Sequence, residues 1–204
     1  MDMTAYLCEI RHAVESLIPI IWSEHKAEAE AVEQLKMLQA TTENAYRRVA
    51  FIMDNDLDDD GIGNGLYWDT YFGVDKQRYH ASERIEALEA VRDARSFSRA
   101  VLSAALLQIA KQGLSQVHGR LTSVPTSRRV FGVDIKDLIW QGRNHALHWE
   151  EGKPSPSVVD CFNAMASYDP AFANYKATNL AFQVVAALGW LDWTNFELDM
   201  VSLS

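Results

Sequence analysis

The sequence predicts an all-α protein, a helical bundle of about five to six helices that forms a single domain over residues 1–204. Apolar residues recur every three or four positions through long segments, which is the spacing of one helix face. Only 5 prolines and 10 glycines interrupt the 204 residues, so these segments are long enough for helices. The one segment with strand-like aromatic residues, Leu66–Val74, has no evident pairing partner.

Two helices are predicted in the N-terminal part of the chain. Thr4–Ile18 carries an apolar stripe that we expect to end near Pro19, because proline interrupts the interior of a helix. From Ile20 to about Met53 the polar face is rich in Glu and Lys, and a break within Ala40–Asn44 is left open. Residues 54–80 are then predicted to be an acidic and aromatic loop insertion.

Four more helices are predicted after this insertion. Their expected ranges are Ala81–His118, about Asp134–Trp149, Ser157–Tyr168 and Ala177 to about Phe196. Ser82 can cap the first of them, and Glu83 follows in its first turn, where the helix dipole favours an acid. Residues 119–132 are predicted to be a loop.

Composition and charge limit the classes of function. The formal net charge is −9, and a protein that coats nucleic acid non-specifically would be basic, so any nucleic-acid activity needs a local basic patch. Cys8 and Cys161 lie far apart and form no cluster with histidine, which favours a reducing cytosol over a disulfide framework or a zinc site. Charged residues interrupt the N-terminus, unlike a secretory signal. These features predict a cytoplasmic protein.

The segment Trp140–Gly152, WQGRNHALHWEEG, concentrates polar and titratable side chains between apolar runs. On a helix, Asn144 and His148 are one turn apart and share a face, and Arg143 is long enough to reach them. The pattern therefore predicts that an arginine, an amide and an imidazole converge on one spot.

Those three groups suit chemistry at a phosphodiester. Histidine titrates near neutral pH, so His148 can act as a general base or acid. Arginine is always charged and binds phosphate through a fork of donors, so Arg143 can hold the phosphate and its developing charge. Asn144 can orient either partner. We predict these three as catalytic residues.

The pattern Arg-Asn-x-x-x-His at Arg143–His148 resembles the signature of the HEPN superfamily, a group of all-α domains with many metal-independent endoribonucleases. The resemblance implies a HEPN-like bundle that dimerises and brings two motifs into one cleft. It also implies RNA cleavage by attack of the ribose 2′-OH, which leaves a cyclic phosphate, without a cofactor. Such domains occur in toxin–antitoxin and phage-defence systems, so an antitoxin or regulatory protein is an expected partner. Some toxin members carry a tyrosine that an antitoxin modifies, where this chain has Glu150.

A modest basic cluster precedes and enters the motif. Arg120, Arg128, Arg129 and Lys136 can guide RNA phosphates to the motif, or they can belong to a solvated loop. We predict RNA binding by the last three of these and by His145, which is expected to lie exposed beside the site.

Two segments contain possible metal ligands, but no metal site is predicted at either. Asp56–Gly61 imitates the start of a calcium loop, but the position that needs a bidentate glutamate holds Tyr67. His145 and His148 lie next to two glutamates, but a catalytic zinc needs a third ligand, which would have to come from His118, His12 or an acid elsewhere. No HExxH or paired ExxH spacing supports such a site.

Two functions stay open at this point. The first is a metal-independent endoribonuclease of HEPN type, a toxin or phage-defence effector. The second is a non-catalytic HEPN-like helical module that binds a nucleotide, an RNA or a partner protein, which agrees better with the net charge of −9.

Overall fold

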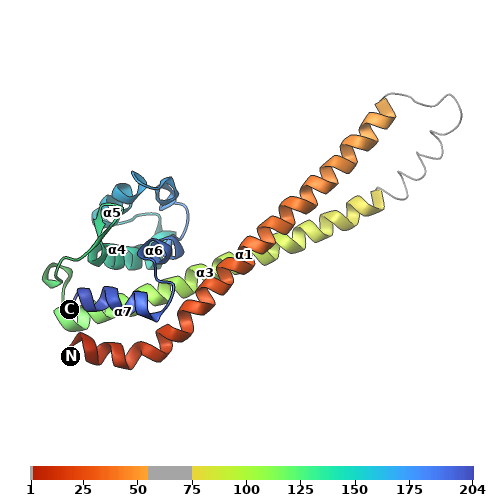
Figure 1. Ribbon diagram of the computed structural model, residues 1–204. Helices are drawn as coiled ribbons and strands as arrows, with labels where there is room; N and C mark the ends of the chain where they lie inside the picture. Colours follow the sequence, from red (N-terminus) through yellow and green to blue (C-terminus); the bar gives the residue numbers. More distant parts are fainter. Residues whose placement is uncertain (1, 55–74) are drawn as a thin grey trace, which may run out of the picture. The chain divides into compact units, whose positions relative to one another are not determined.

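The computed structural model describes residues 2–54 and 75–204 (Figure 1). The described residues form six α-helices: α1 (Met3–Asp54), α3 (Asp75–His118), α4 (Ile135–His148), α5 (Pro156–Ala166), α6 (Ala181–Leu188) and α7 (Trp193–Ser202). Three short 3₁₀ helices and one hairpin connect them: Leu121–Ser123, Trp149–Glu151, Pro170–Asn174, β1 (Arg129–Val130) and β2 (Val133–Asp134). The prediction of an all-α protein is confirmed. None of the described helices combines the length and apolar character that a bilayer span requires.

The chain divides into two compact units. The first unit contains Met1–Glu24 and Phe97–Ser204, and the second contains His25–Ser96. All the candidate site residues of the motif helix belong to the first unit. The single domain over residues 1–204 stays a prediction.

Helix α1 continues through Pro19, so the helix end expected there is wrong. A proline inside a helix costs about 3 kcal/mol, because it lacks the N–H that would bond to the preceding turn. Ile18 and Ile21, on either side of it, are fully buried. Burial of each such side chain stabilises by roughly 1.5–3 kcal/mol, which is enough to hold the helix together across the proline.

The helix also runs without a break through Ala40–Asn44. The hydroxyls of Thr41 and Thr42 donate hydrogen bonds to the carbonyls of Met37 and Leu38, each at 2.8 Å. These bonds to the preceding turn satisfy the threonine hydroxyls within the helix. The open alternative of a break is therefore not realised.

The predicted insertion over residues 54–80 is too long at both ends. Asp54 is the last residue of α1, and α3 begins at Asp75 and not at Ala81. The weighed calcium loop Asp56–Gly61 and the aromatic segment Leu66–Val74 lie outside the described residues.

One helix predicted from Ala177 to about Phe196 is instead two helices, α6 and α7. Gly189 ends α6 in the left-handed region at φ 72°, and its N–H donates to the carbonyl of Ala186. Asp192 then caps α7 by accepting from the backbone N–H of Asn195 at 3.0 Å. A glycine after a helix and an aspartate before one are the ordinary stop and start signals.

The predicted loop over residues 119–132 contains a hairpin that continues to Asp134. Strands β1 and β2 pair antiparallel, with Val130 opposite Val133. Phe131 and Gly132 between them have φ values of 48° and 77°, which is the sign pattern of a two-residue type I′ turn. The ring of Phe131 stacks on Tyr168, and this packing compensates for its unfavourable backbone region.

Helix α4 forms the centre of the first unit. Its apolar residues Ile135, Leu138 and Ile139 are fully buried, and the helix contacts both α5 and α6 (Figure 1). Gly142 allows the close approach of α6, since a β-carbon built there would lie 2.9 Å from Cγ1 of Val184. The observed range of α4 confirms the motif helix predicted for residues 134–149 to within one residue at each end.

We expect Gly113→Ala to destabilise the first unit. An added β-carbon would lie 2.5 Å from Cε1 of Tyr6, whose ring is buried and whose hydroxyl donates to the carbonyl of Ile109 at 2.7 Å. Such overpacking costs about 1–3 kcal/mol, of which alanine's helix propensity recovers at most about 1 kcal/mol. Urea unfolding measures the difference. The exposed neighbour variant Gln112→Ala should be neutral, and equal midpoints for the two variants would contradict the prediction.

Candidate functional site

The motif residues occupy the C-terminal half of α4. Asp134 caps the helix by accepting from the backbone N–H of Lys136 at 3.1 Å, and it also accepts from the N–H of Ser127. Asp137 in the first turn suits the positive end of the helix dipole. At the other end, His148 is the last residue of α4, and the 3₁₀ helix that follows contains Glu151. Asp134 and Asp137 thus stabilise the start of α4, and the helix ends at the predicted catalytic histidine, His148.

The structure brings Arg143 and Asn144 together on the side of α4 that faces α3. Nη1 of Arg143 donates to Oδ1 of Asn144 at 3.2 Å, and its Nε donates to Oε1 of Gln108 at 2.6 Å. The amide of Asn144 lies 3.4 Å from Oε1 of Gln141. All but Gln141 are partly exposed, so the guanidinium is held in one orientation yet remains accessible.

His148 lies exposed at the end of α4. Its Nδ1 is 2.7 Å from Oε1 of Glu151, and the two side chains are 58% and 60% exposed. A carboxylate at Nδ1 fixes the ring and leaves Nε2 available for proton transfer. Among the described residues, no hydrogen bond joins His148 to Arg143 or Asn144. Two of the three predicted catalytic residues are therefore hydrogen-bonded to each other, and in the described part of the chain the third is hydrogen-bonded to neither.

His145 is buried, with an exposure of 2%, so the expectation that it lies exposed beside the site is wrong. It follows Leu138 by seven residues and thus shares the core-facing side of α4. Its Nε2 is 2.7 Å from the carbonyl oxygen of Tyr175, and its ring packs against Phe162 at 4.6 Å between centroids. The predicted RNA contact of His145 has no support in this position, because the ring serves the core.

Burial of His145 predicts that the protein loses stability in mild acid. Burial lowers the pKa of the imidazole, while its hydrogen bond to Tyr175 acts in the opposite direction. The unfolded chain therefore binds a proton more readily, so this contribution is complete above about pH 6.5 and is lost as the pH falls below it. His145→Gln should reduce the fall in unfolding free energy between about pH 7.5 and about pH 5. The exposed-histidine variant His12→Gln should keep it, and a variant at 145 that keeps the full fall would contradict the assignment.

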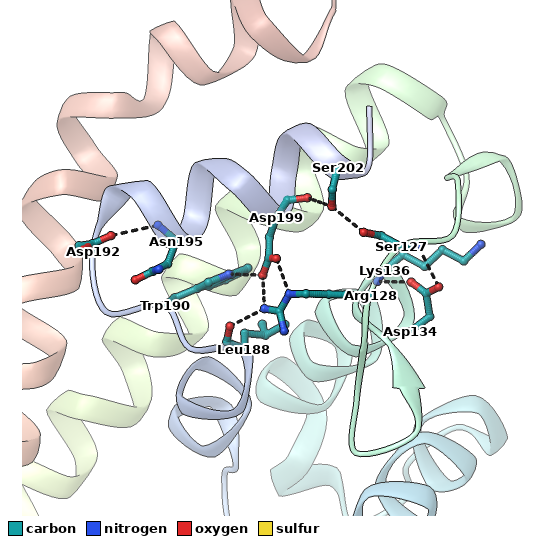
Figure 2. Close-up of polar contacts among 10 residues, drawn as sticks. All are labelled: Ser127, Arg128, Asp134, Lys136, Leu188, Trp190, Asp192, Asn195, Asp199 and Ser202. Atoms are coloured by element: carbon teal, nitrogen blue, oxygen red, sulfur yellow. Dashed lines mark hydrogen bonds and ion pairs between the residues drawn. The ribbon is translucent and has the colours of Figure 1, made fainter.

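The predicted RNA-binding residue Arg128 is engaged within the protein. Its Nε and Nη2 donate to both oxygens of Asp199, at 2.7 and 2.6 Å, and Nη2 also donates to the carbonyl of Leu188 at 2.6 Å (Figure 2). The buried indole of Trp190 donates to the same carboxylate at 2.9 Å. This guanidinium therefore joins the hairpin to α6 and α7. The contact of Arg128 with RNA stays a prediction, and two of its three guanidinium nitrogens already donate within the protein.

The other two predicted basic residues differ in their surroundings. Nζ of Lys136 donates to the carbonyl of Val124 at 2.8 Å, so its ammonium ties α4 to the preceding loop. Arg129 is exposed. Burial raises the pKa of the nearby Asp137, and the charges of Lys136 and Arg129 act in the opposite direction. Arg129 therefore has the exposed position that an RNA contact needs.

Sequence reasoning missed Gln108 and Lys111, which face the motif from α3. Gln108 accepts from Arg143, and Nζ of Lys111 lies 4.5 Å from the centroid of the Trp140 ring. Burial lowers the pKa of Lys111, and the nearby charge of Arg143 lowers it further. A Gln and a Lys three residues apart on a long helix are typical of a solvated face, so the sequence held no signal that distinguished them.

The surroundings of the possible metal ligands on α4 are also defined in the structure. Within residues 2–54 and 75–204, no group of three or more His, Cys, Asp or Glu side chains is placed to hold a metal ion. Nε2 of His145 is occupied by the Tyr175 carbonyl. That nitrogen is therefore engaged within the core of the protein.

Comparison of the chain with known proteins gives no match to a protein-family model, to a curated protein or to a solved structure. The resemblance to the HEPN superfamily consequently depends on the residues of Arg143–His148 and on their position in an all-α protein. The function is argued below from those residues and their surroundings.

Proposed function

We propose that the protein is a metal-independent endoribonuclease of HEPN type that acts as a homodimer, in the role of a toxin or phage-defence effector. The observation that carries the proposal is the exposed imidazole of His148 with the carboxylate of Glu151 at its Nδ1, one helical turn beyond the Arg143–Asn144 pair. A base oriented by a carboxylate and a fixed arginine are the parts that phosphodiester cleavage needs.

In the proposed reaction the ribose 2′-oxygen attacks the adjacent phosphorus. The bond from the 2′-oxygen to phosphorus forms, the bond from phosphorus to the 5′-oxygen breaks, and the product is a 2′,3′-cyclic phosphate with a free 5′-hydroxyl. His148 accepts the 2′-OH proton or donates one to the leaving oxygen. Arg143 uses Nε and Nη1 for Gln108 and Asn144, so its remaining N–H groups can bind the phosphate and the charge that develops on it.

A homodimer would complete this site. Because no hydrogen bond joins His148 to Arg143 or Asn144 within the described residues of one chain, we propose that Arg143 of one copy works with His148 of the other. Mixing Arg143→Ala and His148→Ala chains should then restore part of the cleavage activity, since one site of each mixed dimer holds both wild-type residues. Failure to recover activity in verified mixed dimers would place both residues in the site of a single chain.

Incubation of the purified protein with labelled single-stranded RNAs in EDTA tests the activity. We expect cleavage products that end in cyclic phosphate, because no step of the proposed reaction uses a metal ion. Products ending in a 3′-hydroxyl, or cleavage only after a divalent metal is added, would contradict the proposal. The test of the individual side chains is taken up in the Discussion.

The alternative proposal is a non-catalytic helical module that binds a nucleotide, an RNA or a partner protein. Two observations favour it: no hydrogen bond joins His148 to Arg143 among the described residues, and the net charge is −9. Binding of RNA without cleavage would support this function. Expression in cells distinguishes the two proposals, since a nuclease should slow growth and its His148→Ala form should not.

A further inference from the structure

Two pairs of side chains face each other where α3 meets α4. Gln108 and Lys111 are three residues apart on α3, and Trp140 and Arg143 are three residues apart on α4. Residues three apart lie on the same face of a helix. Gln108 bonds to Arg143 at 2.6 Å, and Lys111 sits over the ring of Trp140 at 4.5 Å. The contacts thus place an ammonium and a guanidinium side by side at one junction of two helices.

These two cations are not neutralised within the described residues. No salt bridge of the described part of the chain includes Lys111 or Arg143, although the protein carries an excess of acids. Burial lowers the pKa of Lys111, and the repulsion from the charge of Arg143 lowers that pKa further. Both side chains remain partly exposed, so an anion from solution can reach them.

We propose that Lys111 is a further RNA-binding residue, which holds a phosphate of single-stranded RNA together with Arg143 and is itself positioned by Trp140. This inference rests on the proposed function and names a substrate contact from outside the motif helix. An anion between two partly desolvated cations removes their repulsion and gains an attraction from each. The ring of Trp140 is occupied by the ammonium, so its role is to hold Lys111 over the junction and not to stack on a base.

Binding of a labelled single-stranded RNA of mixed sequence to the full chain, measured at several salt concentrations, tests the proposal. The measurement uses His148→Ala in every protein, so that the RNA stays intact. Each phosphate contact to single strands contributes about 0.7 to the slope of log affinity against log salt. We expect Lys111→Met to lower that slope by about 0.7 and to weaken binding at low salt, and Lys111→Arg to restore both.

Lys176→Met is the matched control. Lys176 also lies over an aromatic ring, at 5.7 Å from the centroid of Tyr175, but no interaction couples it to Arg143. Its removal should leave the salt slope unchanged. Methionine keeps the apolar stem of the lysine over the ring, and thermal unfolding of each variant verifies that it is folded.

The outcomes separate this inference from the proposed function. If the wild-type chain cleaves RNA and Lys111→Met binds RNA with an unchanged slope, Lys111 is no phosphate contact and only this inference fails. If the wild-type chain neither binds nor cleaves RNA, both proposals fail. An equal loss in Lys111→Met and Lys176→Met would show general charge attraction and would also overturn the specific contact.

Discussion

Replacing His148 by alanine is expected to lower the rate of RNA cleavage by about 10²–10⁴-fold, the usual contribution of a general acid or base. The loss should fall on kcat, because the imidazole acts on protons that move during the reaction. Single-turnover cleavage of labelled RNA in EDTA measures it, with the wild-type chain beside the variant. A variant that cleaves at the wild-type rate would remove His148 from the mechanism.

The same substitution should leave the fold intact, which separates a catalytic histidine from a structural one. The side chain of His148 is 58% exposed, and the carboxylate of Glu151, to which it is hydrogen-bonded, is 60% exposed. Exposed pairs of this kind contribute about 0–1 kcal/mol to stability. Circular dichroism and urea unfolding should therefore be close to those of the wild type. If His148→Ala unfolds, its loss of cleavage is no evidence for a catalytic role of His148.

Glu151→Gln provides a control for the orientation of the imidazole. The glutamine oxygen can still accept a hydrogen bond from Nδ1, but it carries no charge to stabilise an imidazolium. We expect a smaller loss of cleavage than in His148→Ala. A loss as large as that of His148→Ala would make the carboxylate itself essential.

The bounds predicted for α4 agree with the structure to within one residue at each end, and the structure shows why this helix is well defined. Asp134 caps its start, and the buried positions that follow keep a helical spacing as far as Ala146. Proline was given too much weight at Pro19, where buried isoleucines on both sides outweigh its local cost. Glycine was given too little at Gly189, which separates α6 from α7. In both cases the competing signal came from packing or from a short connection that periodicity does not detect.

The candidate site was harder to predict because its partners are distant in sequence. The hydrogen bond between Arg143 and Gln108 joins residues that are 35 positions apart in the sequence, and no local pattern predicts it. His145 looked like a polar neighbour of the motif, although its spacing from Leu138 already placed it on the buried side. Arg128 looked like a cation available to RNA, although its carboxylate partner lies 71 positions away. The sequence therefore identifies a charged residue, but the partner of that residue can be identified only in the folded chain.

Arg128→Met should be the most destabilising single change among the predicted basic residues, at about 3 kcal/mol. Asp199 is only 5% exposed, and its oxygens accept from Arg128 and from the buried indole of Trp190. Removing the guanidinium leaves a buried carboxylate with one neutral donor, and breaking a buried pair in this way costs about 3–5 kcal/mol. The exposed side of Arg128 places our expectation at the lower end of that range. Urea unfolding of Arg129→Met, an exposed neighbour, provides the matched control and should differ little from the wild type.

A second variant tests whether the buried charge is the cause. In Arg128→Met with Asp199→Asn, the side chain at 199 is neutral and can still accept from Trp190, so part of the lost stability should return. The carbonyl of Leu188, one of the free acceptors at the end of α6, loses its donor in both forms and should account for the remainder. A double variant no more stable than Arg128→Met would show that the lost bond to α6, and not the unpaired carboxylate, is what holds the hairpin to the last two helices.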